Sequence, residues 1–190
     1  FVREEDVRLP FDQARARALL TEAGYPQGFS ITLDCPNNRY INDEQICQAV
    51  AAMWTRVGVR TTVQAQPLGP FFAKLQRDEV SAYLFGWGVP TLDALYSFQS
   101  LLATRAPGQG DGIWNNGLYS NPQMDLLVRR MKTESGEGRA DAIRQAMRLM
   151  REEVPLIPLH HQMIPWAMRS NVSIPHAANN QPFFRWATVR

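Results

Sequence analysis

The apolar positions near the start of the chain change from helical to strand-like spacing. An N-cap residue, Asp12, and a terminating glycine, Gly24, bracket the first predicted helix. Its apolar face comprises Ala16, Leu19, Leu20 and Ala23. Apolar residues then alternate with other residues over 29–33, which predicts a strand that ends near Pro36. The pattern therefore begins as helix followed by strand.

A second helix–strand pair follows a polar loop at 37–42. Asp43 is the expected N-cap of the helix, and Gly58 is expected to end it. The apolar face of this helix comprises Ile46, Val50, Met53, Trp54 and Val57. A β-branched strand is predicted over 59–65, and a short helix over 70–77.

The third strand of the pattern covers 81–87, and a helix is predicted over 92–103. After a glycine-rich loop, an Asn–Pro start at Asn121 and a later run over 139–153 predict two more helices. A strand is predicted at 155–161, followed by strands and loops. This alternation is typical of an α/β fold, with a mixed, mainly parallel sheet flanked by helices.

The tail of the chain has a different character. Residues 170–182 are polar and rich in Asn and Pro, whereas Phe183, Phe184, Trp186 and Val189 crowd together after them. A terminal strand with this much aromatic surface needs a partner. We expect the chain to be a fragment, with the partner of this strand in the part that is missing.

Composition excludes several classes of protein. The 190 residues are 45% hydrophobic and 20% charged, as in an ordinary globular protein. A net charge of +2 gives no field that favours nucleic acid, and no apolar run has the length to span a bilayer. Cys35 and Cys47 are too few for a disulfide framework. A bridge between them stays open, and two partly buried free thiols are the favoured interpretation.

No catalytic or metal-binding motif stands out. The chain lacks a dinucleotide or phosphate loop, a zinc-protease motif and a nucleophile elbow. His160 and His161 are adjacent in a predicted strand, where neighbouring side chains point to opposite faces and do not share a metal. We therefore expect no cofactor, no metal and no enzymatic activity. A hydrolase or transferase is a minor alternative that an activity screen would test.

Binding chemistry instead gathers in the loops that follow predicted strands. Asn38, Arg39 and Tyr40 follow the first strand, and Trp87, Gly88 and Asp93 follow the third. Trp114 follows the glycine-rich loop. Aromatic faces, amides and a guanidinium suit a polar organic ligand, and the guanidinium matches a carboxylate. The alternative is structural: the asparagines satisfy turns, Arg39 pairs with a nearby acid, and Trp87 caps the core.

Five segments of the chain carry a further signal: 11–26 with its Ala-Gly-Tyr-Pro end, 54–59, the Phe-Gly-Trp at 85–87, 114–122, and 144–160 with its Val-Pro-Leu-Ile-Pro-Leu run. In this order they resemble one family, the extracytoplasmic solute-binding proteins of peptide/nickel-type ABC importers. The resemblance covers nearly the whole chain. It implies a two-lobed periplasmic protein that closes on a solute and delivers it to a membrane permease. This chain would supply the C-terminal ligand-binding lobe with residues 1–169, and 170–190 would return to pack on the missing N-terminal lobe. A sensory or chaperone-like module that signals to a partner protein is the alternative.

The resemblance also assigns roles to the candidate residues. Arg39 matches the arginine that holds the ligand carboxylate in dipeptide-binding members. The aspartate that receives the ligand's amino group in those members aligns with Pro90, whereas Asp93 matches a different aspartate. Without that carboxylate, an ammonium group would be buried unpaired. We therefore expect an organic acid, a modified peptide or a sugar derivative, with Trp87 stacking on it and Asn38 and Asp93 making polar contacts.

Overall fold

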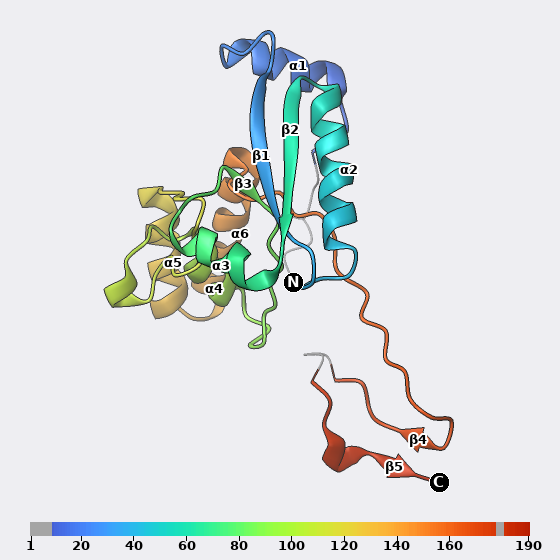
Figure 1. Ribbon diagram of the computed structural model, residues 1–190. Helices are drawn as coiled ribbons and strands as arrows, with labels where there is room; N and C mark the ends of the chain where they lie inside the picture. The colour runs from blue at the N-terminus through green and yellow to red at the C-terminus, as the bar shows by residue number, and fades with distance from the viewer. Residues whose placement is uncertain (1–8, 178–180) are drawn as a thin grey trace.

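A parallel three-stranded sheet forms the centre of the computed structural model, which describes residues 9–177 and 181–190 (Figure 1). The strand order is β2–β1–β3, with β1 at Phe29–Pro36, β2 at Val59–Gln66 and β3 at Ala82–Tyr83. The register of β1 on β2 runs without a break from Phe29 opposite Val59 to Pro36 opposite Gln66. The predicted α/β class, with a mainly parallel sheet, is confirmed.

Helix α2, at Asp43–Arg56, covers one face of this sheet (Figure 1). Leu33 and Cys35 of β1 pack with Cys47 of α2 in a small buried cluster. Helix α1, at Gln13–Glu22, lies at the end of the sheet where β1 and β2 begin (Figure 1). As predicted, Asp12 caps α1, since its carboxylate accepts a hydrogen bond from the Arg15 amide.

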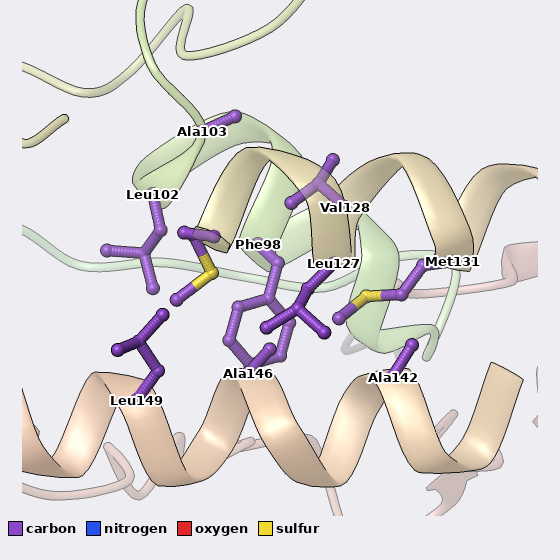
Figure 2. Close-up of a cluster of buried hydrophobic side chains, with 10 residues drawn as sticks. Phe98, Leu102, Ala103, Leu127, Val128, Met131, Ala142, Ala146 and Leu149 are labelled. Atoms are coloured by element: carbon purple, nitrogen blue, oxygen red, sulfur yellow. The ribbon is translucent and has the colours of Figure 1, made fainter. Parts of the chain in front are cut away.

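The larger core lies between the later helices. Helix α4, at Ala94–Ser97, continues as a π-helical turn at Phe98–Leu102. Helix α5 spans Pro122–Thr133 and α6 spans Gly136–Glu153. Phe98 projects between α5 and α6 among apolar side chains from both helices (Figure 2). The predicted helix over 92–103 is therefore present, in two geometries.

The two cysteines form a disulfide, so the interpretation as free thiols was wrong. Their Cα atoms lie 6.7 Å apart, and both side chains are buried, with 0% and 1% of their surface exposed. The physical reason is the packing of α2 directly on β1. This packing brings the end of a strand and the first turns of the next helix together, a distance that the sequence spacing alone did not define.

Three other predictions needed correction. Asp43 does not cap α2 from outside, because it is the first helical residue and the preceding Asn42 takes a left-handed backbone, with φ of 57°. β3 is shorter than the strand predicted at 81–87. The Leu84 amide still donates to the Asp34 carbonyl of β1, but β1 ends at Pro36, which has no N–H with which to continue the pairing. No strand forms at 155–161 within the described residues, where prolines interrupt the run.

Helix α3, at Leu68–Gln76, begins directly after β2 and ends close to the prediction. Two short segments complete the middle of the chain: a 3₁₀ turn at Pro107–Gln109 and a single bridge between Ala106 and Asp111. None of the described helices is both long and apolar enough to cross a bilayer.

The tail forms an antiparallel pair of its own. β4, at Val172–Ser173, pairs with β5, at Thr188–Val189, after a 3₁₀ turn at Phe184–Trp186. We expected β5 to pair with a segment outside the chain, but its backbone partner is β4. The pair lies apart from the rest of the chain (Figure 1). Phe184 and Val189 are 72% and 73% exposed, so the apolar surface of the tail stays uncovered. Residues 178–180 of the predicted polar loop lie outside the described residues.

Candidate functional site

The loops that follow β1 and β3 meet at the carboxyl edge of the sheet, where α/β proteins commonly bind ligands. Residues 37–42 form the first loop and 84–93 the second. Helix α3 starts at the same edge, directly after β2. The candidate residues taken from the sequence lie in these two loops, apart from Trp114.

Asp43 fixes the backbone of the first loop. One carboxylate oxygen accepts hydrogen bonds from the amides of Arg39 (2.9 Å) and Tyr40 (3.0 Å), and the other accepts from Glu44 (3.0 Å). Only 3% of its surface is exposed. Charge-assisted bonds of this kind, at the start of a helix, are stronger than neutral ones.

Arg39 projects from this ordered loop. Its guanidinium carbon lies 5.4 Å from the centre of the Tyr40 ring, and the residue is exposed. Within residues 9–177 and 181–190, the side chain of Arg39 takes part in no ion pair. The alternative, that it pairs with Asp43 or Glu44, is therefore not what the structure has: Asp43 binds the backbone of Arg39 instead.

Tyr40 connects the first loop to the second. Its hydroxyl accepts a hydrogen bond from the Gly86 amide, at 2.9 Å across 46 residues of sequence. The ring also lies so close to Gly86 that a Cβ there would be 2.6 Å from Cε1 of Tyr40. Gly86 is thus required by the close approach of a ring, and its backbone is not left-handed.

Asn38 has a structural partner. Its side-chain oxygen accepts a hydrogen bond from the Leu68 amide at 2.9 Å, which satisfies one of the free N–H groups at the start of α3. A second contact holds the same helix. Lys74 donates to the buried carboxylate of Asp34 at 2.6 Å and to Gln64 at 3.0 Å. Together these contacts fix α3 against β1 and β2.

Helix α3 supplies part of a wall of aromatic rings. Phe72 contacts Phe85 and Trp114 edge-on, with ring centres 6.1 and 6.0 Å apart. Phe85 in turn lies 5.8 Å from Trp114 and 6.2 Å from Trp87. Such pairs add about 0.5–1.5 kcal/mol each beyond their buried area. Trp87 and Trp114 therefore belong to one surface, although they lie far apart in sequence.

Trp87 is held at its edge and on its face. Its indole N–H donates to the Ser97 hydroxyl at 3.2 Å. The Tyr96 ring stacks on it with centres 5.1 Å apart and planes 21° apart. Both partners come from α4, which was not among the candidate segments. Trp87 is half-buried, so part of the indole stays at the surface.

Asp93 is engaged by groups of the protein itself. It caps α4 by accepting from the Leu95 amide at 2.8 Å, and the same oxygen accepts from the Arg139 guanidinium at 2.6 Å. The Arg139 hydrogen bond holds the pKa of Asp93 below its usual value. Gly88 is exposed, and no atom lies within 4 Å of the position its Cβ would occupy.

The neighbours of Trp114 are structural. Asn115 is 2% exposed; its side chain donates to the carbonyls of Ala103 and Tyr119 and accepts from the Tyr119 amide. The Asn115 side chain thus bonds the backbone groups of a turn, as expected if the asparagines of these loops have a structural role and do not bind ligand. Tyr83, behind the wall, has a pKa raised above its usual value by burial.

A shallow groove of about 400 Å³ lies beside the first loop. Its lining combines Ile41, Asn42 and Ile46 with the segment 160–163. His160 and His161 both line this groove. The expectation that their side chains point to opposite faces applied to a strand, and this segment is not a strand. No cluster of three or more metal-ligating His, Cys, Asp or Glu occurs in the described part of the chain. A second hollow, of about 300 Å³, lies at the other end of the sheet, between α1 and the end of α2.

The contacts thus connect Arg39, Tyr40, Trp87 and Trp114 along one edge, whereas Asn38 and Asp93 serve the helices beside it. Sequence reasoning missed Asp43 as the residue that orders the first loop, and missed the residues of α4 that hold Trp87. The spacing of Asp43 after Arg39 was a usable signal, since Asp side chains often bond nearby backbone amides. Nothing local indicated the contact of Tyr40 with Gly86.

Comparisons with known proteins agree with this picture. A family model described as bacterial extracellular solute-binding proteins, family 5 (middle part), matches residues 2–109, more than half of the 190. The glutathione-binding protein GsiB of Salmonella paratyphi A is 29% identical over 172 residues, which cover 86% of this chain and 33% of GsiB. A dipeptide-binding protein of Pseudomonas aeruginosa is 30% identical over 186 residues, covering 93% of this chain and 32% of that protein.

Two solved structures show the same fold. A dipeptide-binding protein from Pseudoalteromonas in complex with Met-Leu superposes with a TM-score of 0.80 at 24% identity, covering 95% of this chain and 36% of that one. MoaA of Agrobacterium tumefaciens with mannopinic acid gives 0.83 at 19% identity, covering 100% and 39%. The chain spans about a third of the length of the curated relatives it matches. The sequence match and the fold together place this chain in the family of bacterial extracellular solute-binding proteins, family 5.

Proposed function

We propose that this chain is a ligand-binding lobe of the substrate-binding component of an ABC importer, and that it captures a small organic solute carrying an anionic group. The observation that carries the proposal is the exposed guanidinium of Arg39, on a loop that Tyr40 joins to the loop of Trp87. A guanidinium binds a carboxylate in bidentate fashion, and an indole face suits an apolar or ring-shaped portion. The role is binding and delivery, without catalysis.

The groups around Trp87 favour a solute without a free ammonium group. Residues 88–92 contain no acidic side chain. The next carboxylate, Asp93, already accepts from Leu95 and Arg139. An ammonium group buried here would lack a charge partner, at a cost of several kcal/mol. An organic acid, a modified peptide or a sugar derivative fits this chemistry better than an ordinary dipeptide.

We further propose that the described body of 9–169 is one lobe and that 170–190 packs on a second lobe of the intact protein. The exposed aromatic side chains of the tail support this division, because Phe184 is 72% and Trp186 46% exposed. Solute would then bind between the lobes and favour a closed form that docks on an inner-membrane permease. The location that follows is the bacterial periplasm.

The test is a thermal-shift and native mass spectrometry screen of the intact protein. The panel contains glutathione, Met-Leu and mannopinic acid, the solutes named for relatives, together with other organic acids. Arg39→Ala is expected to weaken the binding of an anionic solute by at least about 30-fold, because a desolvated charge contact is lost. Arg129→Ala, an exposed arginine on α5, is the control and should bind as wild type.

Two results would overturn the proposal. Equal affinities of Arg39→Ala and wild type would remove Arg39 from the site. Tight binding of Met-Leu that is lost in Asp93→Ala would show that Asp93 receives an amino group, contrary to a solute without one. Gly88→Ala adds a check on geometry: its Cβ meets open space, so any loss of affinity would report close approach of the solute.

A further inference from the structure

We infer that Tyr40 and Asp43 are positioning residues that hold Arg39 and Trp87 at a set spacing before solute binds. The inference rests on the proposed function, since it concerns the same site. Arg39 and Trp87 lie on different loops, and a site that uses both needs those loops joined. The contacts that join them involve neither the guanidinium nor the indole.

The first step is the order of the loop after β1. Three backbone amides, those of Arg39, Tyr40 and Glu44, converge on the carboxylate of Asp43. Asp43 is nearly fully buried, at 3% exposure, so water competes little for these bonds. The backbone of Arg39 is therefore fixed although its side chain is exposed.

The second step is the bond between loops. The Tyr40 hydroxyl accepts from the Gly86 amide, directly before Trp87. The ring of Tyr40 occupies the space where any side chain at position 86 would project, 2.6 Å from Cε1 and 2.8 Å from Cζ. Tyr40 therefore holds Gly86 in two ways, through a hydrogen bond and through close contact of its ring. We name this pair the Tyr40–Gly86 latch.

The third step is the far side of Trp87, where α4 holds the indole through Ser97 and Tyr96. Trp87 is therefore fixed from both directions, by the latch before it and by α4 beside it. A preformed site avoids the ordering cost that a flexible one meets on binding. We conclude that solute meets a ready-made surface on this lobe.

Hydrogen exchange of the ligand-free intact protein tests the latch directly. Tyr40→Phe keeps the ring and removes the hydroxyl, so the Gly86 amide should exchange about fivefold faster, the effect of one lost hydrogen bond. Tyr25→Phe, a hydroxyl removed at the other end of β1, is the matched control and should leave Gly86 unchanged. Equal exchange at Gly86 in Tyr40→Phe and wild type would overturn the inference.

A double-mutant cycle tests the ring contact. Gly86→Ala should displace the Tyr40 ring and speed exchange at the amides of Tyr40 and Trp87. In a Tyr40→Ala background, the same change meets no ring and should add nothing. Additive effects of Tyr40→Ala and Gly86→Ala would show that the two residues act separately and that there is no latch.

Binding separates this role from general stability. With N-acetyl-Met-Leu as probe, a modified peptide that has a carboxylate and no ammonium group, Tyr40→Phe should weaken binding about fivefold while the melting temperature of the ligand-free protein stays at the wild-type value. If N-acetyl-Met-Leu does not bind wild type, the proposed solute class is wrong for this modified peptide, and exchange at Gly86 still decides the latch. If N-acetyl-Met-Leu binds through Arg39 but Gly86 exchange does not respond to Tyr40→Phe, the function stands and the latch is overturned.

Discussion

Removal of the Cys35–Cys47 bridge should destabilise the unit formed by β1 and α2 by about 3 kcal/mol. The two residues are separated by 12 positions in sequence. For a closed loop of this length, the chain-entropy relation gives about 2.8 kcal/mol at 25 °C, chiefly by restricting the unfolded chain. Both side chains are buried, so replacement by Ala adds a small packing loss to this value.

Hydrogen exchange of the amides in β1 and α2 gives the free energy of opening of this unit, even where a second lobe unfolds separately. Cys35→Ala, Cys47→Ala and the double variant should lose nearly the same amount, because either change removes the one bridge. A non-reducing peptide map of wild type should recover the two segments as one linked peptide. Separate peptides carrying free thiols, or losses in the two single variants that add up in the double, would refute the reasoning.

The bridge also encloses the loop that carries Arg39 and Tyr40. Its loss should therefore weaken solute binding in addition to lowering stability. Asp43 continues to bond the backbone of this loop without the bridge, so we expect the binding effect to be smaller than that of Asp43→Ala.

Two further predictions concern stability. Gly28→Ala should destabilise the protein by about 2 kcal/mol or more in urea unfolding, because the added Cβ would lie 1.8 Å from the Gly58 carbonyl oxygen and φ is +67°. Gly69→Ala, in α3 with nothing within 4 Å, is the control and should be neutral or slightly stabilising. Asp93→Asn keeps a good N-cap but removes the charge pair with Arg139. Because the pKa of Asp93 is lowered in the folded protein, the pair contributes above about pH 4 and is lost as pH falls below it. The variant should be less stable by up to about 1 kcal/mol at neutral pH and equal to wild type in acid, and a difference that persists in acid would contradict this.

The sequence predicted those parts of the fold that depend on local patterns. The first helix, with Asp12 as cap, and the two long strands were placed within a few residues, because periodicity and caps act over one or two turns. The strand expected at 155–161 did not form because Pro155 and Pro158 interrupt the run, and the apolar pattern was given more weight than these prolines. The helix over 92–103 was found, but its change to π-helical geometry has no local signal.

The candidate site also contains features that local sequence predicts and features that it does not predict. Arg39 and Trp87 could be chosen from residue type and from their place after strands. Their connection through Gly86 could not, because the Tyr40 bond spans 46 residues. The ion pair of Asp93 with Arg139 likewise spans 46 residues and was not readable from the loop, whereas the N-cap of α4 by Asp93 is a local feature, with the Leu95 amide only two residues away.

The short segment between Gly86 and Asp93 has a bearing on how the family evolves. Residues 88–92 lie between Gly86 and Asp93, which are both held by other parts of the protein. Within residues 9–177 and 181–190, the hydrogen bonds of this segment are local turn contacts. Insertions, deletions or substitutions within this short segment would leave the sheet and the helices as they are. If the proposed site is right, exchange of this one short loop changes the solute preference of a family member, while the scaffold around the loop is inherited unchanged.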